Sequence, residues 1–312
     1  MKIINRIFHY VVMSASIVLC LLLLYQTSSR HFLNFCICNC GMDSEGSQWF
    51  SQRYNSSARV LLNRQNHAVD FNTFWWWRSL QNESNAANYT KVVEVLFDHF
   101  PDKRHHLDHS PSRCRSCAVV GNSGNMLGSQ YGALIDSNDF IMRMNEGPTV
   151  GYERDVGHKT THRIIYPESA VDLEDQTHLV LLPFKILDLQ WLISIFTTKH
   201  IDQTYMHVRP SIKADKSKVM ILHPAFIKYV FESWSQNVGN YPSTGFISII
   251  LALHICDEVS VFGFGSTHDR VWHHYFDDFG LGSNDGPHAG DFERSVIAEL
   301  HQRRIITMYK GW

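Results

Sequence analysis

The sequence has almost no excess of charge of either sign, no internal repeat and no low-complexity tract. Lys and Arg number 28 against 30 Asp and Glu, which gives a formal net charge of -2. This balance gives no electrostatic reason to expect a nucleic-acid partner. Hydrophobic residues make up 44% and charged residues 19% of the 312 residues, so the chain is long and apolar enough for one large globular domain or two small ones.

The glycine-rich fingerprint G-x-G-x-x-G is also missing. Gly121, Gly124 and Gly128 give G-x-x-G-x-x-x-G instead. The first spacing is the one that holds a dinucleotide at the start of a helix, so its absence disfavours an NAD-type reductase on a doubly wound sheet.

Residues 114–125 are the stretch around which we organise the chain. Ala118 to Val120 form a short apolar run, which is typical of a strand buried on both faces of a parallel sheet. Gly121 and Gly124 then allow a sharp turn at the strand's carboxyl end, the edge where open α/β sheets bind ligands. Small hydrogen-bonding residues follow there: Asn122, Ser123 and Asn125. An ordinary strand–turn–helix connection has the same pattern and stays open as an alternative.

Strands and helices alternate along the rest of the chain and predict an α/β domain with a mainly parallel sheet. Strand-like runs occur at 140–145, 161–166, 178–183, 219–222 and 258–265. Helical patterns occur at 91–100, 188–197, 225–236 and 246–256, and an amphipathic pattern follows His288.

Three further places carry chemistry. Ser243 or Thr244 is a good N-cap for the apolar helix after Gly245, and the free backbone N–H groups of a helix start favour an anionic ligand. Capping without a ligand is the alternative. The paired His273 and His274, and His288, are suited to proton transfer near neutral pH. A solvated loop and a helix-terminus residue are the corresponding structural alternatives.

Residues 7–25 contain no Lys, Arg, Asp or Glu and predict a transmembrane helix, at about 1.5 Å per residue through a hydrocarbon core of about 30 Å. Lys2 and Arg6 precede this segment, which favours a cytosolic amino terminus. A cleaved signal peptide is the alternative, but its apolar region is usually shorter, about 7–15 residues. We therefore expect a type II signal anchor with the body of the protein in the secretory lumen.

Sequons and cysteines agree with a lumenal body. Asn55, Asn82 and Asn88 each begin a glycosylation sequon. Of the seven cysteines, Cys20 lies in the predicted membrane span, which leaves an even number outside it, as suits an oxidising compartment. These are Cys36, Cys38, Cys40, Cys114, Cys117 and Cys256. A zinc site at the first three fits poorly, because structural zinc sites favour C-x2-4-C spacing, and the pairing of the six stays open.

Taken together, these stretches resemble the four sialyl motifs of the eukaryotic sialyltransferases, glycosyltransferase family 29. The large motif is similar to Cys117-Ala-Val-Val-Gly-Asn-Ser-Gly-Asn125 through Arg143-Met-Asn145 to Tyr166-Pro-Glu-Ser169. The small motif is similar to Tyr241-Pro-Ser-Thr-Gly245 through Cys256-Asp-Glu-Val259 to Gly263-Phe-Gly265. Trp272-His-His-Tyr275 resembles the third motif, and His288 to Glu293 the very small one. Within the family, 223–230 and the Cys36–Cys40 cluster look most like the β-galactoside α-2,3-sialyltransferases that act on Gal-β1,3-GalNAc.

The resemblance implies a single Rossmann-like, GT-A-variant sialyltransferase fold at 51–312, with a mainly parallel central sheet flanked by helices. It follows a cytosolic tail at 1–6, the transmembrane helix at 7–25 and a lumenal stem at 26–50, in a type II protein of the Golgi membrane. The implied reaction transfers sialic acid, with inversion, from CMP-sialic acid to the 3-hydroxyl of terminal galactose in O-glycans or glycolipids. A non-catalytic glycan-binding protein on the same fold is the alternative. Oligomeric state stays open.

The resemblance also implies residue roles. His288 is expected to be the general base and His274 to contact the departing phosphate. Donor-binding positions are expected at Asn122, Ser123, Asn145, Tyr166, Ser169, Tyr205, Ser243, Thr244, Gly245, Gly263, Gly265 and His274. Acceptor-side positions are expected at Gln81, Tyr241, Phe264 and Trp272. The implied disulfides are Cys117–Cys256, Cys38–Cys114 and Cys36–Cys40.

We expect neither cofactor nor metal. Many nucleotide-sugar transferases use D-x-D to hold a divalent cation on a diphosphate, and this chain contains no such tripeptide. A CMP donor carries a single phosphate, so an imidazole and amide donors are expected to suffice.

Overall fold

The computed structural model describes residues 44–81, 87–100, 114–201, 206–267, 273–277 and 288–311. The predicted tail, membrane span and most of the stem lie outside these residues, as do Cys36, Cys38, Cys40, Asn82, Tyr205 and Trp272. Within the described residues no helix is both long and apolar enough to cross a membrane.

A seven-stranded sheet forms the centre of the protein, in the order β5-β4-β3-β2-β1-β6-β7, and all its neighbouring strands are parallel. The strands are β1 (Ser116–Val120), β2 (Phe140–Met144), β3 (His162–Ile165), β4 (His178–Leu181), β5 (Val219–Ile221), β6 (Glu258–Phe262) and β7 (Thr307–Tyr309). The chain builds β1 to β5 outward in one direction and then returns to place β6 on the other side of β1. The strand order therefore reverses between β1 and β6.

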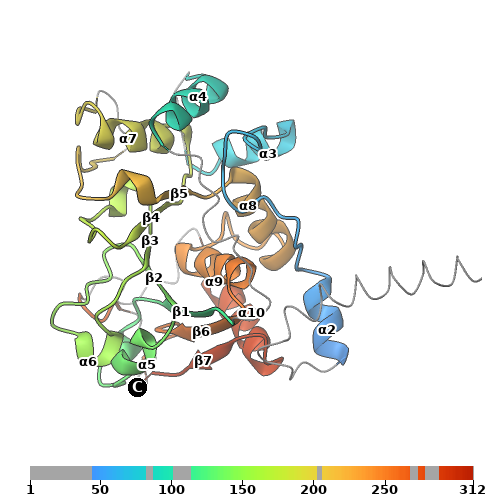
Figure 1. Cartoon of the computed structure of the whole chain (residues 1–312). Helices are drawn as coiled ribbons and strands as arrows, with labels where there is room; N and C mark the ends of the chain where they lie inside the picture. Colours follow the sequence, from blue (N-terminus) through green and yellow to red (C-terminus); the bar gives the residue numbers. More distant parts are fainter. Residues whose placement is uncertain are drawn as a thin grey trace, which may run out of the picture.

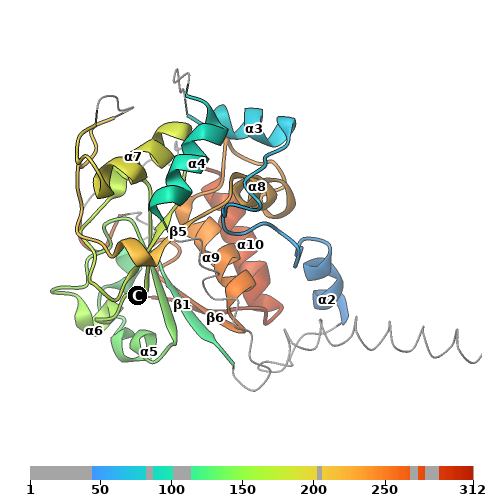
Figure 2. The same cartoon turned by 45° about the horizontal axis from the view of Figure 1, so that its top comes forward.

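Helices cover both faces of the sheet (Figures 1 and 2). α9 (Thr244–Ile255) and α10 (Gly290–Gln302) lie on one side, and α5 (Gly132–Asp136) and α6 (Glu153–Val156) on the other. The remaining helices are α2 (Ser44–Ser51), α3 (Phe71–Arg78), α4 (Tyr89–His99), α7 (Ile186–Phe196) and α8 (Pro224–Tyr229). Short 3-10 turns are η1 (Gly124–Met126), η2 (Pro167–Ser169) and η3 (Lys216–Lys218), and the π-helical turn η4 (Val230–Trp234) extends α8.

The alternation of side chains along β1 explains the two layers. Cys117 and Val119 join the large hydrophobic cluster on the α9 side, whereas Ala118 and Val120 join a smaller cluster on the opposite face. All four are buried, as a strand covered on both faces requires.

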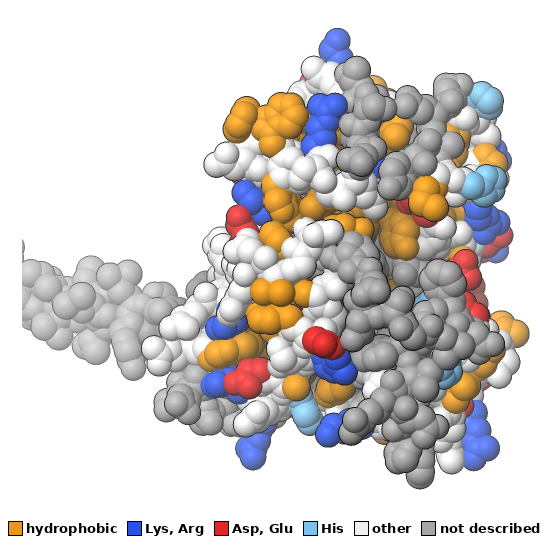
Figure 3. All heavy atoms as spheres, turned by 180° about the vertical axis from the view of Figure 1, so that it is seen from behind, with side chains coloured by type: hydrophobic (Ala, Val, Ile, Leu, Met, Phe, Trp, Pro, Cys, Tyr) orange, Lys and Arg blue, Asp and Glu red, His pale blue; other side chains and the backbone are white. Residues whose placement is uncertain are grey.

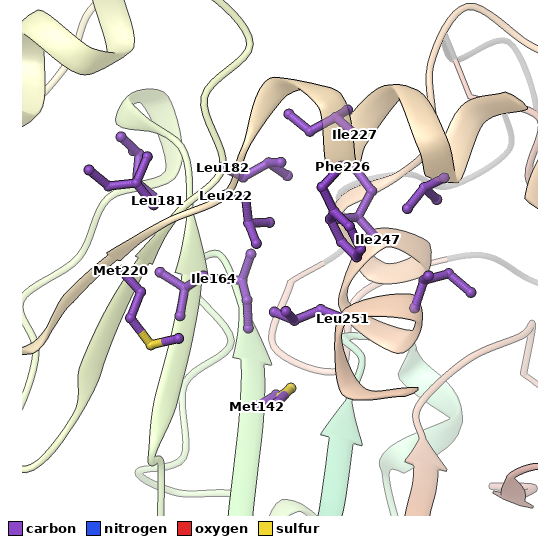
Figure 4. Packing of buried hydrophobic residues seen from close by; sticks show 14 of the residues in the cluster. Met142, Ile164, Leu181, Leu182, Met220, Leu222, Phe226, Ile227, Ile247 and Leu251 are labelled. Carbon is purple, nitrogen blue, oxygen red and sulfur yellow. The ribbon is translucent and has the colours of Figure 1, made fainter. Parts of the chain in front are cut away.

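The larger cluster is built where α8 and α9 meet the sheet (Figure 4). Phe226 and Ile227 of α8 and Ile247 and Leu251 of α9 face Met142 of β2, Ile164 of β3 and Leu222, which follows β5. α9 has apolar residues on all its sides and is buried along almost its whole length. A helix of this kind belongs in the interior of a protein, whereas a surface helix has one polar face. Each such side chain contributes about 1.5–3 kcal/mol by burial.

The disulfide Cys117–Cys256 is present and joins β1 to the residue that ends α9. This confirms one of the three implied pairs. Cys114 is also disulfide-bonded, and the cysteines expected to pair with it or with each other lie outside the described residues.

The three consecutive tryptophans of α3 point to different surroundings, because neighbours on a helix cannot share a face. Trp77 is fully buried and its Nε1 donates to the carbonyl of Pro183 at 2.8 Å. Trp76 stacks on Phe231, whereas Trp75 is 50% exposed. Hydrophobic side chains gather on the surface over this helix (Figure 3).

Several elements of the structure differ from the predicted ones, and the short helices α2, α3, α5 and α6 were not predicted. β7, an edge strand with three half-buried residues, was not predicted. The predicted helix 225–236 is a short α8 followed by η4. α2 runs across the expected boundary between stem and catalytic domain at residues 50 and 51, and Phe50 is buried in the core.

Candidate active site

The carboxyl ends of β1 and β6 approach each other so closely that both turns need glycine. Gly121 N donates to the carbonyl of Phe262 at 2.7 Å. A Cβ on Gly121 would collide with the carbonyl of Gly263, and Gly263 itself has φ of 70°. Because the strand order reverses here, this is the place where open α/β sheets bind ligands.

Ser123 ties the two turns together. Its Oγ donates to the carbonyl of Gly265 at 2.6 Å, and its backbone N donates to that of Gly263 at 3.2 Å. The same Oγ accepts from Asn125 N at 3.2 Å and so begins η1. The predicted donor-binding residues Ser123, Gly263 and Gly265 therefore form one connected group.

His274 lies directly beside this group. It forms an isolated antiparallel bridge with Ser123, and the next residue, Tyr275, donates its backbone N–H to the carbonyl of Asn122 at 2.9 Å. Nδ1 of His274 lies 2.9 Å from Oδ1 of Asp277. Since an ionised carboxylate only accepts, Nδ1 carries the proton of this contact.

The end of β2 is held by a buried arginine. Arg163 donates to three successive carbonyls, those of Asn145 (3.2 Å), Glu146 (3.2 Å) and Gly147 (3.0 Å). These bonds hold the turn in which Asn145 has φ of 52°. Asn122 Nδ2 donates to the adjacent Met144 carbonyl at 3.3 Å.

The burial of Arg163 lowers its pKa to about 10, so the guanidinium is cationic at neutral pH. The three hydrogen bonds of its guanidinium to this turn go to carbonyl oxygens. The positive charge therefore lies beneath the turn among carbonyl dipoles, with Glu174 as a carboxylate that acts on it from nearby.

His288 precedes α10 and lies against Tyr241, just before the start of α9. Its Nδ1 lies 3.0 Å from the carbonyl of Tyr241, and its ring packs edge-on against the Tyr241 ring at 4.9 Å. A carbonyl can only accept, so Nδ1 carries the hydrogen. In the neutral ring Nε2 then holds the lone pair, which is the arrangement a general base needs.

Glu293 fastens the start of α10 to the start of α9. Its Oε1 accepts from Ser243 N at 2.7 Å and its Oε2 from Ser243 Oγ at 2.6 Å. Ser243 Oγ in turn accepts from Phe246 N at 3.1 Å, as an N-cap does. Burial raises the pKa of Glu293, whereas the bonds from Ser243 and the nearby His288 lower it, with a net rise.

Two sets of aromatic contacts connect these parts. Tyr166, Phe184 and Tyr241 pack in a row that His288 closes, with centroids 5.9, 5.2 and 4.9 Å apart. The Phe264 ring lies close to both glycine turns. A Cβ on Gly245 would lie 2.8 Å from its ring and one on Gly121 3.0 Å from it, so the β1 turn and the start of α9 meet at this ring.

The sequence matches the profile of glycosyltransferase family 29 (sialyltransferase) over residues 61–305. The chain belongs to this family. Its described fold matches that of solved mammalian sialyltransferases. It is 44% identical in sequence, with a TM-score of 0.79, to a mammalian sialyltransferase crystallised with Gal-beta-1-3GalNAc-ortho-nitrophenol, and the match covers 86% of this chain and 97% of that one.

Curated relatives of this family 29 chain carry α-2,3-sialyltransferase names. It is 46% identical over 281 residues to CMP-N-acetylneuraminate-beta-galactosamide-alpha-2,3-sialyltransferase 1 of Gallus gallus, covering 88% of this chain and 82% of that protein. It is 42% identical over 280 residues to the sialyltransferase 2 of Rattus norvegicus, covering 88% and 80%.

Most of the site positions expected for a family 29 enzyme lie in the two connected regions described above. One region is the edge of β1 and β6, and the other is the start of α9 with His288. Ser169, which is buried in η2, bonds through Oγ to the backbone of Tyr166. Thr244 is the first residue of α9, and Gln81 lies three residues after α3 and bonds to Lys185. Tyr205 and Trp272 lie outside the described residues.

Several site residues were not singled out in the sequence. Glu293 is the last residue of the motif that begins at His288, and Asp277 lies two residues after the motif that ends at Tyr275. Arg163 lies inside a predicted strand. Only the fold shows that Asp277 pairs with His274 and that Arg163 holds the Asn145 turn. Phe184 carries no sequence signal beyond its place after a predicted strand.

No three His, Cys, Asp or Glu side chains of the described residues lie close enough together to hold a metal ion. The expectation of a metal-free reaction therefore still rests on the missing D-x-D and on the single phosphate of the donor.

Proposed function

We propose that this chain transfers sialic acid from CMP-sialic acid to the 3-hydroxyl of terminal galactose in Gal-β1,3-GalNAc, with inversion. The observation that carries this proposal is the hydrogen bond that leaves Nε2 of His288 as the basic nitrogen, in a chain 46% identical to a β-galactosamide α-2,3-sialyltransferase.

In the proposed reaction His288 Nε2 removes the proton of the galactose 3-hydroxyl as its oxygen forms a bond to the anomeric carbon of sialic acid. The bond from that carbon to the CMP phosphate breaks on the opposite face, and CMP leaves with the electron pair. A general base contributes typically about 10²–10⁴-fold. The contact of Nδ1 with the Tyr241 carbonyl supports this role, because it favours the tautomer that can accept the proton.

His274 is proposed to meet the phosphate that gains charge as CMP departs. With Nδ1 held by Asp277, a protonated ring would donate from Nε2 to a phosphate oxygen. Its bridge to Ser123 supports this placement, because it puts the ring at the edge where the strand order reverses. The positive charge of Arg163 beneath the neighbouring turn would favour the same anion.

The remaining proposed roles are donor binding and acceptor binding. We propose donor binding by Asn122, Ser123, Asn145, Tyr166, Ser169, Tyr205, Ser243, Thr244, Gly245, Gly263 and Gly265, and acceptor contacts by Gln81, Tyr241, Phe264 and Trp272. The row Tyr166–Phe184–Tyr241–His288 supports this division, because it runs from a proposed donor residue to the proposed base.

We further propose that residues 7–25 anchor the chain as a type II protein of the Golgi membrane, with residues 51–312 as the lumenal catalytic domain. Asn55 and Asn88 are exposed, as glycosylation requires, and Cys114 is disulfide-bonded, as an oxidising lumen allows. Removal of N-glycans with an endoglycosidase from protein made in animal cells should increase its gel mobility. Unchanged mobility would count against lumenal exposure of the sequons.

The test of the proposed function is a transfer assay with CMP-sialic acid and Gal-β1,3-GalNAc, followed by linkage analysis of the product. We expect an α-2,3-linked product, and the same rate with and without EDTA. Binding of the acceptor without turnover would instead identify a non-catalytic glycan-binding protein. Activity abolished by EDTA and restored by a divalent cation would overturn the metal-free proposal.

A further inference from the structure

Lys185 is a buried lysine whose ammonium group lies among polar side chains from three separate parts of the chain. Its side chain is 2% exposed. Nζ lies 2.7 Å from Oε1 of Gln81, 3.0 Å from Oε1 of Glu168 and 2.7 Å from Oδ1 of Asp188. These partners follow α3, lie in η2 and lie in the first turn of α7, respectively. Removal of one charged side chain from this cluster would lower the stability of the fold, because it would leave an unpaired charge buried.

The charges of this cluster favour a cationic lysine. Burial lowers the pKa of Lys185, but the carboxylates of Asp188 and Glu168 raise it by more. Burial raises the pKa of Asp188 to about 7, against the opposing effect of Lys185. Lys185 therefore acts as a fixed positive donor at neutral pH.

The same cluster holds the backbone beside the proposed base. Asp188 Oδ2 accepts from the backbone N of Phe184 at 2.7 Å. The Phe184 ring packs between Tyr166 and Tyr241, and Tyr241 packs against His288. Lys185 and its partners thus lie one layer behind the row of rings that His288 closes.

The contact with Lys185 also fixes which end of the Gln81 amide faces the cluster. An ammonium group has three donors and no acceptor, so it must face the oxygen Oε1. The NH2 group at Nε2 is the other branch of the amide, and it donates no hydrogen bond to the described part of the chain. Gln81 therefore presents two N–H donors away from Lys185.

We propose that Lys185 is a positioning residue for acceptor recognition, which holds Gln81 so that its amide donates to a hydroxyl oxygen of the galactose acceptor. This inference rests on the proposed function. It predicts that Lys185 affects acceptor binding through Gln81 and has little effect on binding of the CMP-sialic acid donor.

The test is a double-mutant cycle on the full chain with Gln81→Ala, Lys185→Met and both together. The Michaelis constants for Gal-β1,3-GalNAc and for CMP-sialic acid are measured separately. Each single change should raise the acceptor KM about 5- to 30-fold, the range for one lost hydrogen bond, with the donor KM within about twofold of wild type. The double variant should be no worse than the more severe single one, because both remove the same contact.

Two further variants separate positioning from stability. Leu192→Ala removes a fully buried side chain from the same helix, α7, and should lower the melting temperature without changing the acceptor KM. Gln81→Glu keeps the contact with Lys185 but can no longer donate, so it should raise the acceptor KM as Gln81→Ala does. If Lys185→Met does not fold, Gln81→Glu still tests whether the Gln81 amide donates to the acceptor.

An acceptor KM unchanged in Lys185→Met, or in Gln81→Glu, would overturn the proposal. So would additive effects in the double variant, or an equal rise in the donor KM. Titration of the same variants with Gal-β1,3-GalNAc gives dissociation constants without turnover. A wild type that binds the acceptor but transfers nothing would therefore count against the proposed function, while the titrations still test the role of Lys185.

Discussion

Acidification from pH 7 to pH 5 should destabilise the protein through one buried histidine, His223. The residue is fully buried at the start of α8. Its Nδ1 accepts from Ala225 N at 2.9 Å, and its Nε2 lies 3.0 Å from the carbonyl of Asn66. Both contacts require the neutral ring with its hydrogen on Nε2, because a proton on Nδ1 would face the Ala225 N–H group.

The size of the effect follows from the pKa difference between the folded and unfolded chain. Burial lowers the pKa of His223 from 6.5 to about 4. For a base with a lowered pKa, the unfolded chain binds the proton first, so stability is complete above pH 6.5 and is lost as the pH falls from 6.5 towards 4. Linkage gives a loss of about 2 kcal/mol at pH 5, rising to about 3 kcal/mol below pH 4.

Urea unfolding at pH 7 and pH 5 measures this loss, and His223→Gln isolates it, because glutamine does not titrate. The variant should lose about 2 kcal/mol less than wild type between the two pH values, whatever its stability at pH 7. His207→Gln is the matched control, because His207 is exposed, and it should keep the wild-type pH dependence. An equal loss in His223→Gln and wild type would refute the reasoning.

Three further predictions concern the site. Glu293→Ala removes both carboxylate bonds to Ser243 and should lower the free energy of unfolding by about 2–5 kcal/mol, with kcat at least about tenfold lower in initial-rate assays; wild-type values of both would contradict the anchoring role. Gly121→Ala places a methyl group against the Gly263 carbonyl and should cost about 1–3 kcal/mol in urea unfolding, whereas a neutral effect would show that the turns can separate. Cys117→Ala removes a disulfide that closes a long loop and should cost about 2–5 kcal/mol under oxidising conditions, and a change below about 0.5 kcal/mol would contradict a stabilising cross-link.

The central strands could be predicted from the sequence because they are buried on both faces. β1 and β6 read as short apolar runs that end in glycine, and α9 reads as an apolar helix with a serine cap. β7 was not predicted, although Ile305 to Tyr309 form a run of apolar and β-branched residues that is typical of a strand. The order of the strands in the sheet could not be predicted either. The positions of the strand-like segments in the sequence do not determine on which side of β1 the strand β6 is added.

The site could be predicted only as far as its motifs extend. His274, His288 and the glycine turns lie in quoted motifs, and the fold places each at the edge where strand order reverses or beside it. The contacts between residues that lie far apart in the sequence could not be predicted, because only the fold brings such residues together. Lys185 meets Gln81 across 104 positions, and Ser243 meets Glu293 across 50.

The rate of sialic acid transfer by His288→Ala, measured at saturating donor and acceptor, tests the proposed general base most directly. We expect kcat to fall about 10²–10⁴-fold, with the melting temperature and the KM for CMP-sialic acid close to those of wild type. A folded His288→Ala protein that transfers sialic acid at the wild-type rate would contradict the proposed mechanism.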